Sequence, residues 1–122
     1  MSQQRKGGPI NLQINGVTED ARGNFTWGLG RMKAEAVLGS NGPVGYKETA
    51  TTPFIEGEII DRADLDLAAM LDLRDATVSI VLPNGKTVTL FDAYFNGEGV
   101  ANSEEGNIAV RFEGKRAEEI SP

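Results

Sequence analysis

The 122 residues suffice for one buried core, and the net charge of −6, from 18 acidic and 12 basic residues, argues against general affinity for nucleic-acid backbone. The absence of Cys and His removes thiol nucleophiles, disulfides, imidazole bases and most transition-metal sites. No apolar run approaches the roughly 20 residues of a membrane span, and the start lacks a signal-peptide core. We expect an intracellular protein without a cofactor or membrane contact.

The start of the chain predicts an arm followed by a strand. Residues 1–8, MSQQRKGG, are polar and are expected to form a flexible or partner-dependent N-terminal arm. In INLQING, Ile10, Leu12 and Ile14 alternate with polar residues, which is typical of a half-buried strand closed by an Asn-Gly turn. The 15 Gly and repeated Asn-Gly pairs favour β-structure with many turns.

The next segments are less regular. Residues 17–30 mix charges with glycine, and we interpret them as a structured loop whose Phe25 and Trp27 dock on the body. Residues 31–39 alternate as a strand would, although their alanines also allow a short helix. SNGPVG, residues 40–45, predicts a tight connection.

The run GYKETATTPFIEGEIID, from Gly45 to Asp61, has two unlike halves. Its second half has a core face of Ile55, Gly57 and Ile59, whereas neither face of residues 46–52 is apolar enough for a core. Proline at position 53 donates no hydrogen bond to a sheet, so this point is expected at an edge, a bulge or a change of strand.

The second half of the chain predicts one helix and three strands. Acidic residues before a Leu-rich stretch predict a helix at about Asp64 to Leu73. Residues 76–95 alternate on both sides of the turn Pro83 to Lys86, which indicates a β-hairpin with one apolar face. After a polar loop, residues 107–114 predict a final strand with Ile108, Val110 and Phe112 inward, and residues 115–122 form a tail without a core signal.

Catalysis finds little support in these patterns. Glu56 and Glu58 project to one side of a strand, and Asp64 and Asp66 suit helix capping, so solvated or capping roles are favoured over acid–base chemistry. The Gly-rich stretches lack the strand and helix context of a phosphate cradle. The basic residues form no stripe with interleaved aromatics. We therefore expect no enzyme.

The order of the motifs resembles a known family. INLQING, AEAVLGSNGPVGYKET, PFIEGEIID, LDLAAMLDLRDATVSIVLPNGKTVTLFDAYF and EEGNIAVRFEG, from about Ile10 to Gly114, are together similar to the tail tube proteins of Mu-like contractile-tailed bacteriophages. The resemblance implies a mainly β fold, a β-sandwich or partial barrel with one short flanking helix, over residues 9–114. It also implies hexameric rings that stack into the inner tube of the tail.

Partners and location follow from the same resemblance. The implied partners are the chain itself, a tail sheath outside the tube, and tail terminator, baseplate or tape-measure proteins, in a virion tail assembled in the bacterial host cytoplasm. DNA would pass through the lumen without specific binding, because a carboxylate-rich wall repels phosphate. We expect lumen-facing groups to include Lys33, Glu35, Glu48, Glu56, Glu58, Arg111 and Glu113, and ring-stacking groups to include Arg5, Lys6, Asn41, Pro43, Tyr46, Lys115 and Arg116.

Three alternatives stay open at this point. A monomeric β-barrel binding module could use Trp27, Phe25 and Tyr46 as a pocket for a small ligand or peptide. A type VI secretion-like tube protein would share the architecture. An enzyme using Glu56 and Glu58 is the least favoured of the three.

Overall fold

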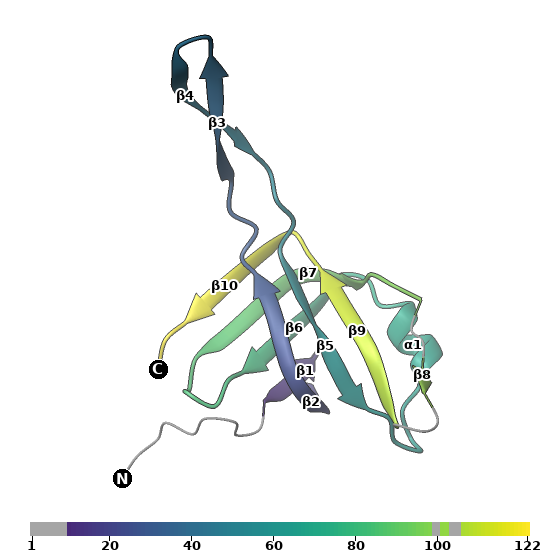
Figure 1. The fold of residues 1–122 in the computed structure, drawn as a ribbon. Coiled ribbons are helices and arrows are strands. Elements are labelled where there is room, and N and C mark those ends of the chain that lie inside the picture. Colours follow the sequence, from purple (N-terminus) through teal and green to yellow (C-terminus); the bar gives the residue numbers. More distant parts are fainter. Residues whose placement is uncertain (1–9, 99–100, 103–105) are drawn as a thin grey trace.

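Six antiparallel strands form a closed barrel (Figure 1). The computed structural model describes residues 10–98, 101–102 and 106–122. Neighbouring strands pair in the order β7-β6-β1-β2-β5-β9, and β9 pairs back with β7 through Tyr94 opposite Glu113 and Phe95 opposite Phe112, which closes the barrel. The barrel strands are β1 (Asn11–Ile14), β2 (Val17–Gly28), β5 (Phe54–Ile60), β6 (Ala76–Val81), β7 (Thr87–Phe95) and β9 (Asn107–Glu113).

Alternating residues from these strands fill the barrel. The largest fully buried side chains are Phe112, Leu12, Ile55, Ile59, Ile80, Leu90, Ile108, Val78 and Val88. Phe95 and Phe112 meet edge to face, with ring centroids 5.4 Å apart. The predicted first strand, the hairpin of β6 and β7 and the strand β9 are thereby confirmed, because their apolar residues are the ones that are buried. Strand β9 is not the final strand, because β10 follows it.

The prediction of a loop at residues 17–30 is wrong, because most of this segment is the long strand β2. Its inward positions are not all apolar, because the inward-facing Glu19 is a buried carboxylate paired with Arg62. A register shift between Arg22 and Thr26 also interrupts the pairing with β5, although Glu19 and Phe25 stay in the same alternation. Phe25 is buried as a core residue, as its expected docking on the body requires.

Gly57 makes room for Phe25. A Cβ atom built at Gly57 would lie 2.6 Å from the Phe25 ring, which is closer than real Cβ contacts. The glycine on the predicted core face of residues 54–60 is therefore required by the packing of an aromatic ring across β5. Ile55 and Ile59, on the same face, are fully buried, as predicted.

Strands β3 (Lys33–Gly39) and β4 (Gly42–Thr49) form a separate two-stranded sheet that projects from the barrel (Figure 1). We call it the projecting hairpin. Of the two possibilities for residues 31–39, the strand is confirmed and the helix is not. The run from Gly45 to Asp61 divides between two sheets, and buried Pro53 precedes β5, so it marks the expected change of strand.

The only helix of the described residues, α1 (Leu67–Leu71), is shorter than predicted. Asp66 caps its N-terminus by accepting a hydrogen bond from the Ala69 amide at 3.0 Å, so the preceding residues lie outside the helix. At the other end Arg74 donates to the carbonyl oxygens of Leu71 and Leu73. No helix in the described ranges has the length and apolar character to cross a membrane.

The end of the chain also differs from the expectation of a tail without a core residue. Strand β10 (Arg116–Ile120) pairs with β7, and Ala117 is buried opposite Leu90. An edge strand needs little apolar area because its backbone bonds and polar contacts hold it. Glu119 accepts a hydrogen bond from Trp27 Nε1 at 3.2 Å and pairs with Lys86 at 3.3 Å. Strand β8 (Ala101–Asn102) lies at the other edge, beside β9.

Candidate assembly surfaces

The outer side of β5 and β9 carries acidic side chains, and we call this surface the acidic face. Its residues are Glu56, Glu58, Ala109, Arg111 and Glu113, which alternate with the buried residues of the same strands. A shallow hollow of about 510 Å³ lies on this face, where Glu98 and Phe95 join residues of β5 and β9. The hollow is open and carries exposed carboxylates.

Arg111 lies at the centre of a polar network on the acidic face. Its Nη1 atom is 3.3 Å from Glu56 Oε1, and its Nε atom is 3.0 Å from Glu113 Oε2. The guanidinium carbon also stands 4.3 Å from the centre of the Phe54 ring, a cation–π contact. Glu56 is directly opposite Arg111 across the ladder, so the register itself brings the pair together.

Glu113 connects this network to β7. The Tyr94 hydroxyl donates to Glu113 Oε1 at 2.9 Å, across the short seam where the barrel closes. Burial raises the pKa of the Glu113 carboxyl, but hydrogen bonds from Tyr94, Asn96 and Arg111 outweigh it and leave the pKa below its usual value. The same bond to Glu113, with burial, raises the pKa of Tyr94.

The projecting hairpin has two unlike faces. On one, Lys33 pairs with Glu35 at 3.5 Å, Glu35 accepts a hydrogen bond from Thr49 at 3.0 Å, and Lys47 lies opposite Glu35 in the register. On the other, strand alternation places Ala34, Ala36, Leu38, Tyr46 and Glu48. We call this second side the apolar face of the hairpin.

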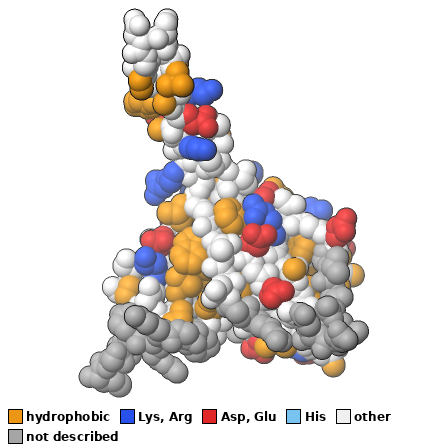
Figure 2. All heavy atoms as spheres, viewed as in Figure 1, with side chains coloured by type: hydrophobic (Ala, Val, Ile, Leu, Met, Phe, Trp, Pro, Cys, Tyr) orange, Lys and Arg blue, Asp and Glu red, His pale blue; other side chains and the backbone are white. Residues whose placement is uncertain are grey.

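Large side chains of the hairpin are exposed. Leu38 is 74% exposed, Val44 72% and Tyr46 68%. Figure 2 shows hydrophobic side chains on the outer part of the projecting hairpin and charged side chains nearer the barrel. Residues 36–46 contain no charged side chain, so this end of the hairpin offers apolar contact and hydrogen bonding but no ion pair.

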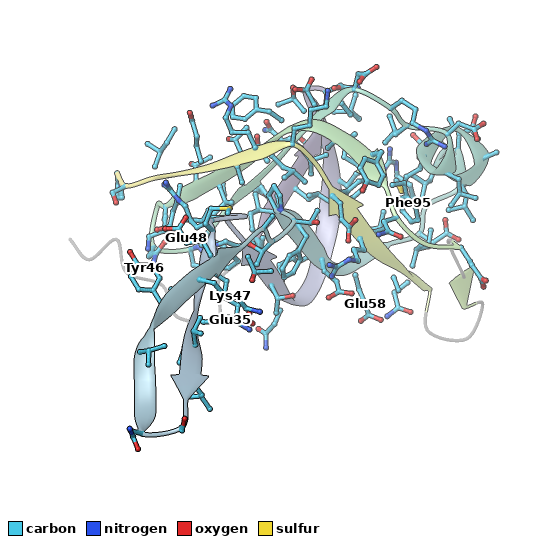
Figure 3. The ribbon with its side chains drawn as sticks, turned by 90° about the horizontal axis from the view of Figure 1, so that it is seen from above. Glu35, Tyr46, Lys47, Glu48, Glu58 and Phe95 are labelled. Atoms are coloured by element: carbon cyan, nitrogen blue, oxygen red, sulfur yellow. The ribbon has the colours of Figure 1, made fainter. Side chains whose placement is uncertain are left out.

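The structure places the predicted lumen-facing residues on two separate surfaces. Glu56, Glu58, Arg111 and Glu113 lie together on the acidic face, whereas Lys33, Glu35 and Glu48 lie on the projecting hairpin. Figure 3 shows this separation, with Glu35, Lys47 and Glu48 on the hairpin and Glu58 on the barrel.

The predicted ring-stacking residues also divide. Pro43 and Tyr46 are in β4 and Asn41 is in the turn before it, whereas Lys115 and Arg116 lie where β10 begins. Arg116 stacks on Phe91 at 4.0 Å and forms an ion pair with Glu118. Arg5 and Lys6 lie outside the described residues.

The aromatic pocket proposed for a binding module does not form. Phe25 is buried in the barrel, Trp27 donates to Glu119 on β10, and Tyr46 lies on the projecting hairpin (Figure 3). Glu56 and Glu58, the pair considered for an enzyme, are both exposed. Within the described ranges no group of three or more Asp or Glu residues could hold a metal ion.

Sequence reasoning missed two contributions. Phe54 and Tyr94 complete the Arg111 network. Both residues lie near the ends of their strands, and both are paired with Glu113, Phe54 from β5 and Tyr94 from β7. Their positions near strand ends were the only signal that the sequence offered. The Glu19 and Arg62 pair was also missed, since a carboxylate in an assumed loop gave no reason to expect burial. Arg62 additionally pairs with Asp64 at 2.7 Å, so it ties the segment before α1 to β2.

In the part of the chain that the structure describes, a closed antiparallel barrel with a long projecting hairpin and one short helix defines the class of fold. A family model described as phage tail tube protein matches residues 3–119, and the chain belongs to this family. Its role is therefore that of a structural tail tube protein. No curated protein gives a significant match.

Solved structures support the fold. A structure titled as the sheath/tube terminator of the extracellular contractile injection system PVC, in the extended state, matches with a TM-score of 0.62 and 7% identity, over 93% of this chain and 94% of that chain. The structure of Hcp1 from Flavobacterium johnsoniae matches with a TM-score of 0.57 and 10% identity, over 94% and 97% of the two chains. At these identities the likeness concerns the fold alone.

Proposed function

We propose that this tail tube protein forms hexameric rings that stack into the inner tube of a contractile tail, through which DNA is ejected. Its partners in this proposal are other copies of the chain, a surrounding sheath, and terminator, baseplate or tape-measure proteins. Assembly takes place in the host cytoplasm, and the subunit has no enzymatic role. The described residues act as one body in this proposal, with the start of β10 near subunit contacts.

The projecting hairpin is the observation that carries this proposal. A two-stranded hairpin is at best marginally stable alone in water, and this one exposes Leu38, Val44 and Tyr46 beyond the barrel. A neighbouring copy that covers the apolar face would bury Leu38 and Tyr46, and pairing along an outer edge of β3 or β4 would remove a free strand edge. In this proposal the hairpin contacts a different surface of the neighbouring copy, so the contact is heterologous and generates rings or filaments.

The acidic face provides the second feature that the proposal needs, a lumen wall that does not bind DNA. Glu56 and Glu58 are exposed there, and strands β5 and β9 contain a single basic residue, Arg111. Closely spaced carboxylates repel phosphate, so DNA would slide along this face with little binding. We assign Glu56, Glu58, Arg111 and Glu113 to the lumen, and Asn41, Pro43 and Tyr46 to contacts between copies.

Two substitutions that introduce a negative charge, one on each side of the hairpin, test the assembly role. Leu38→Asp, on the apolar face, should leave the subunit folded but abolish rings and tubes in negative-stain electron microscopy. Val37→Asp introduces the same charge one residue away on the opposite side and is the matched control, which should still assemble. Tubes formed equally by both variants, or a wild-type chain that stays monomeric at high concentration, would contradict the proposal and favour a binding module.

The lumen assignment is tested by cysteine labelling, since the chain has no native Cys. In assembled tubes, Glu58→Cys should react with a small maleimide but not with one attached to a bulky polymer. Asp72→Cys, at the exposed end of α1, serves as the reference for a position outside the lumen. Reaction of position 58 with the bulky reagent would place the acidic face outside the tube.

A type VI secretion-like tube is the second candidate, because the match to Hcp1 covers nearly all of both chains. It differs in what passes through the lumen, and not in the subunit fold. Purified native particles distinguish the two: a tail joined to a DNA-filled capsid supports the phage role, and tubes without a capsid support the alternative.

A further inference from the structure

The acidic face, as defined above, contains one cationic side chain, Arg111, which forms ion pairs within the subunit. Two carboxylates contact the Arg111 guanidinium from different sides, Glu56 across the ladder and Glu113 along the same strand. The Phe54 ring contacts the guanidinium as well, with its centre 4.3 Å from the guanidinium carbon of Arg111. Only 32% of the Arg111 side chain is exposed.

Glu113 is the better-fixed of the two carboxylates. Its side chain is 14% exposed, against 50% for Glu56, and its second oxygen accepts the hydrogen bond from Tyr94. One Glu113 oxygen thus faces Arg111 while the other is tied to β7, so the carboxylate cannot easily turn away from the guanidinium. Glu56 lacks such a second anchor among the described contacts.

We propose that Glu113, held by Tyr94, is a positioning residue that keeps Arg111 from binding DNA phosphate as the genome passes. Arginine is a strong phosphate ligand because its planar donors match two phosphate oxygens. In a ring, one free arginine per subunit would present a circle of such sites to the duplex. This inference rests on the proposed lumen position of the acidic face and explains how an arginine is tolerated there.

The chain offers a matched control for this idea. Glu113→Gln removes one negative charge from the acidic face and also the main partner of Arg111. Glu58→Gln removes the same charge from the same face, but Glu58 lies opposite Ala109 and forms none of the described ion pairs with Arg111. A difference between these variants therefore reports on Arg111 and not on net charge.

The first measurement concerns the subunit and does not depend on where the face lies in a tube. Phenylglyoxal modification, followed by peptide mass spectrometry, should be several-fold slower at Arg111 than at exposed Arg31 in the wild-type protein. Glu113→Gln should raise the Arg111 rate several-fold, Tyr94→Phe should raise it less, and Glu58→Gln should leave it unchanged. Equal rates at Arg111 and Arg31 in the wild-type protein would overturn the proposal.

The second measurement concerns assembled, sheared tubes mixed with a dye-labelled DNA duplex at low salt. Glu113→Gln tubes should retain duplex, whereas wild-type, Glu58→Gln and the double variant Arg111→Gln with Glu113→Gln should not. Retention should fall as salt is raised, because phosphate binding releases counterions. If Glu113→Gln does not fold, Glu56→Gln removes the other partner and should give a smaller gain.

Two outcomes would contradict the proposal. Equal retention by Glu58→Gln and Glu113→Gln tubes would show that net charge alone governs DNA binding. The proposal would also be rejected if Glu113→Gln tubes are intact and phenylglyoxal modifies their Arg111, but the tubes retain no duplex. This second outcome counts only if Glu58→Cys in assembled tubes is protected from the bulky maleimide. If position 58 is not protected, the lumen assignment has failed and this inference falls with it.

Discussion

The barrel and the projecting hairpin show two ways in which this chain stabilises β-structure. Every strand of the barrel gives alternate side chains to one closed core, with Leu12, Ile55 and Phe112 fully buried. The hairpin has no such core, and its largest apolar residues, Leu38 and Tyr46, are mostly exposed. The barrel is therefore expected to be stable in the isolated subunit, whereas the hairpin depends on contacts that only another molecule can supply.

The two regions also differ in how their charged side chains are used. Ion pairs on the barrel lie within the subunit, as in the Arg111 network, and fix the charge that the acidic face presents. The outer end of the hairpin carries no charge, so it is suited to burial against a neighbour. Substitutions in the two regions should therefore affect different measurements.

The largest effect is expected for Phe112→Ala in the barrel. The change removes a fully buried ring that packs edge to face against Phe95, and it should lower the free energy of unfolding by about 3–5 kcal/mol. Guanidinium unfolding of the subunit, followed by circular dichroism, measures the loss. A loss below about 1 kcal/mol would mean that the barrel core does not hold the subunit as described.

Sequence patterns predicted the parts of the barrel in which the buried positions of each strand are occupied by apolar residues. The β6 and β7 hairpin and strand β9 were predicted because their inward residues are all apolar. Strand β2 was missed, since its inward Glu19 reads as a surface residue until Arg62 is known to reach it. A register shift after Arg22 also interrupts the pairing of β2 with β5, and only the fold shows it, although Phe25 stays in the same alternation as Glu19.

The hairpin and the candidate surfaces were less predictable for a different reason. The polar run after Gly45 has no core face because it pairs only with β3, and no local pattern tells which strand will pair with which. The prediction that this run is held by pairing in an assembly stays a prediction, although its pairing with β3 now explains why it is extended. The Arg111 network depends on a register between β5 and β9 that only the fold defines.

Arg62→Ala should have the second largest effect. Glu19 is 5% exposed, so removal of its partner leaves a buried carboxylate without this counter-charge, and the subunit should unfold at a clearly lower temperature. Lys33→Ala, which breaks an exposed pair on the hairpin, is the control and should cost less than about 0.5 kcal/mol. Thermal unfolding of both variants at equal concentration compares them, and similar losses would contradict the distinction between the two regions.

A smaller effect is expected from pH, through Glu113. Its pKa is lowered in the folded state, so its stabilisation is fully present above the unfolded pKa and is lost as the pH falls through the folded pKa. Tyr94→Phe removes one of the hydrogen bonds that lower the pKa and should reduce stability by less than about 1 kcal/mol near neutral pH. The difference from wild type should shrink in acid unfolding experiments below about pH 4.5. If the difference in stability between Tyr94→Phe and wild type grows towards low pH, the lowered pKa of Glu113 does not stabilise the folded subunit as described.

The smallest effect on the subunit, and the sharpest test of the comparison, is expected for Tyr46→Ala. Tyr46 is 68% exposed, and its ring contributes little burial within one chain, so the free energy of unfolding should change by less than about 0.5 kcal/mol. In the tube, however, the ring is expected to lie against a neighbouring copy, where a buried tyrosine often contributes strongly to binding. Sedimentation of assembled material should therefore fall while subunit unfolding stays unchanged. Loss of subunit stability without loss of assembly would reverse the roles assigned to barrel and hairpin.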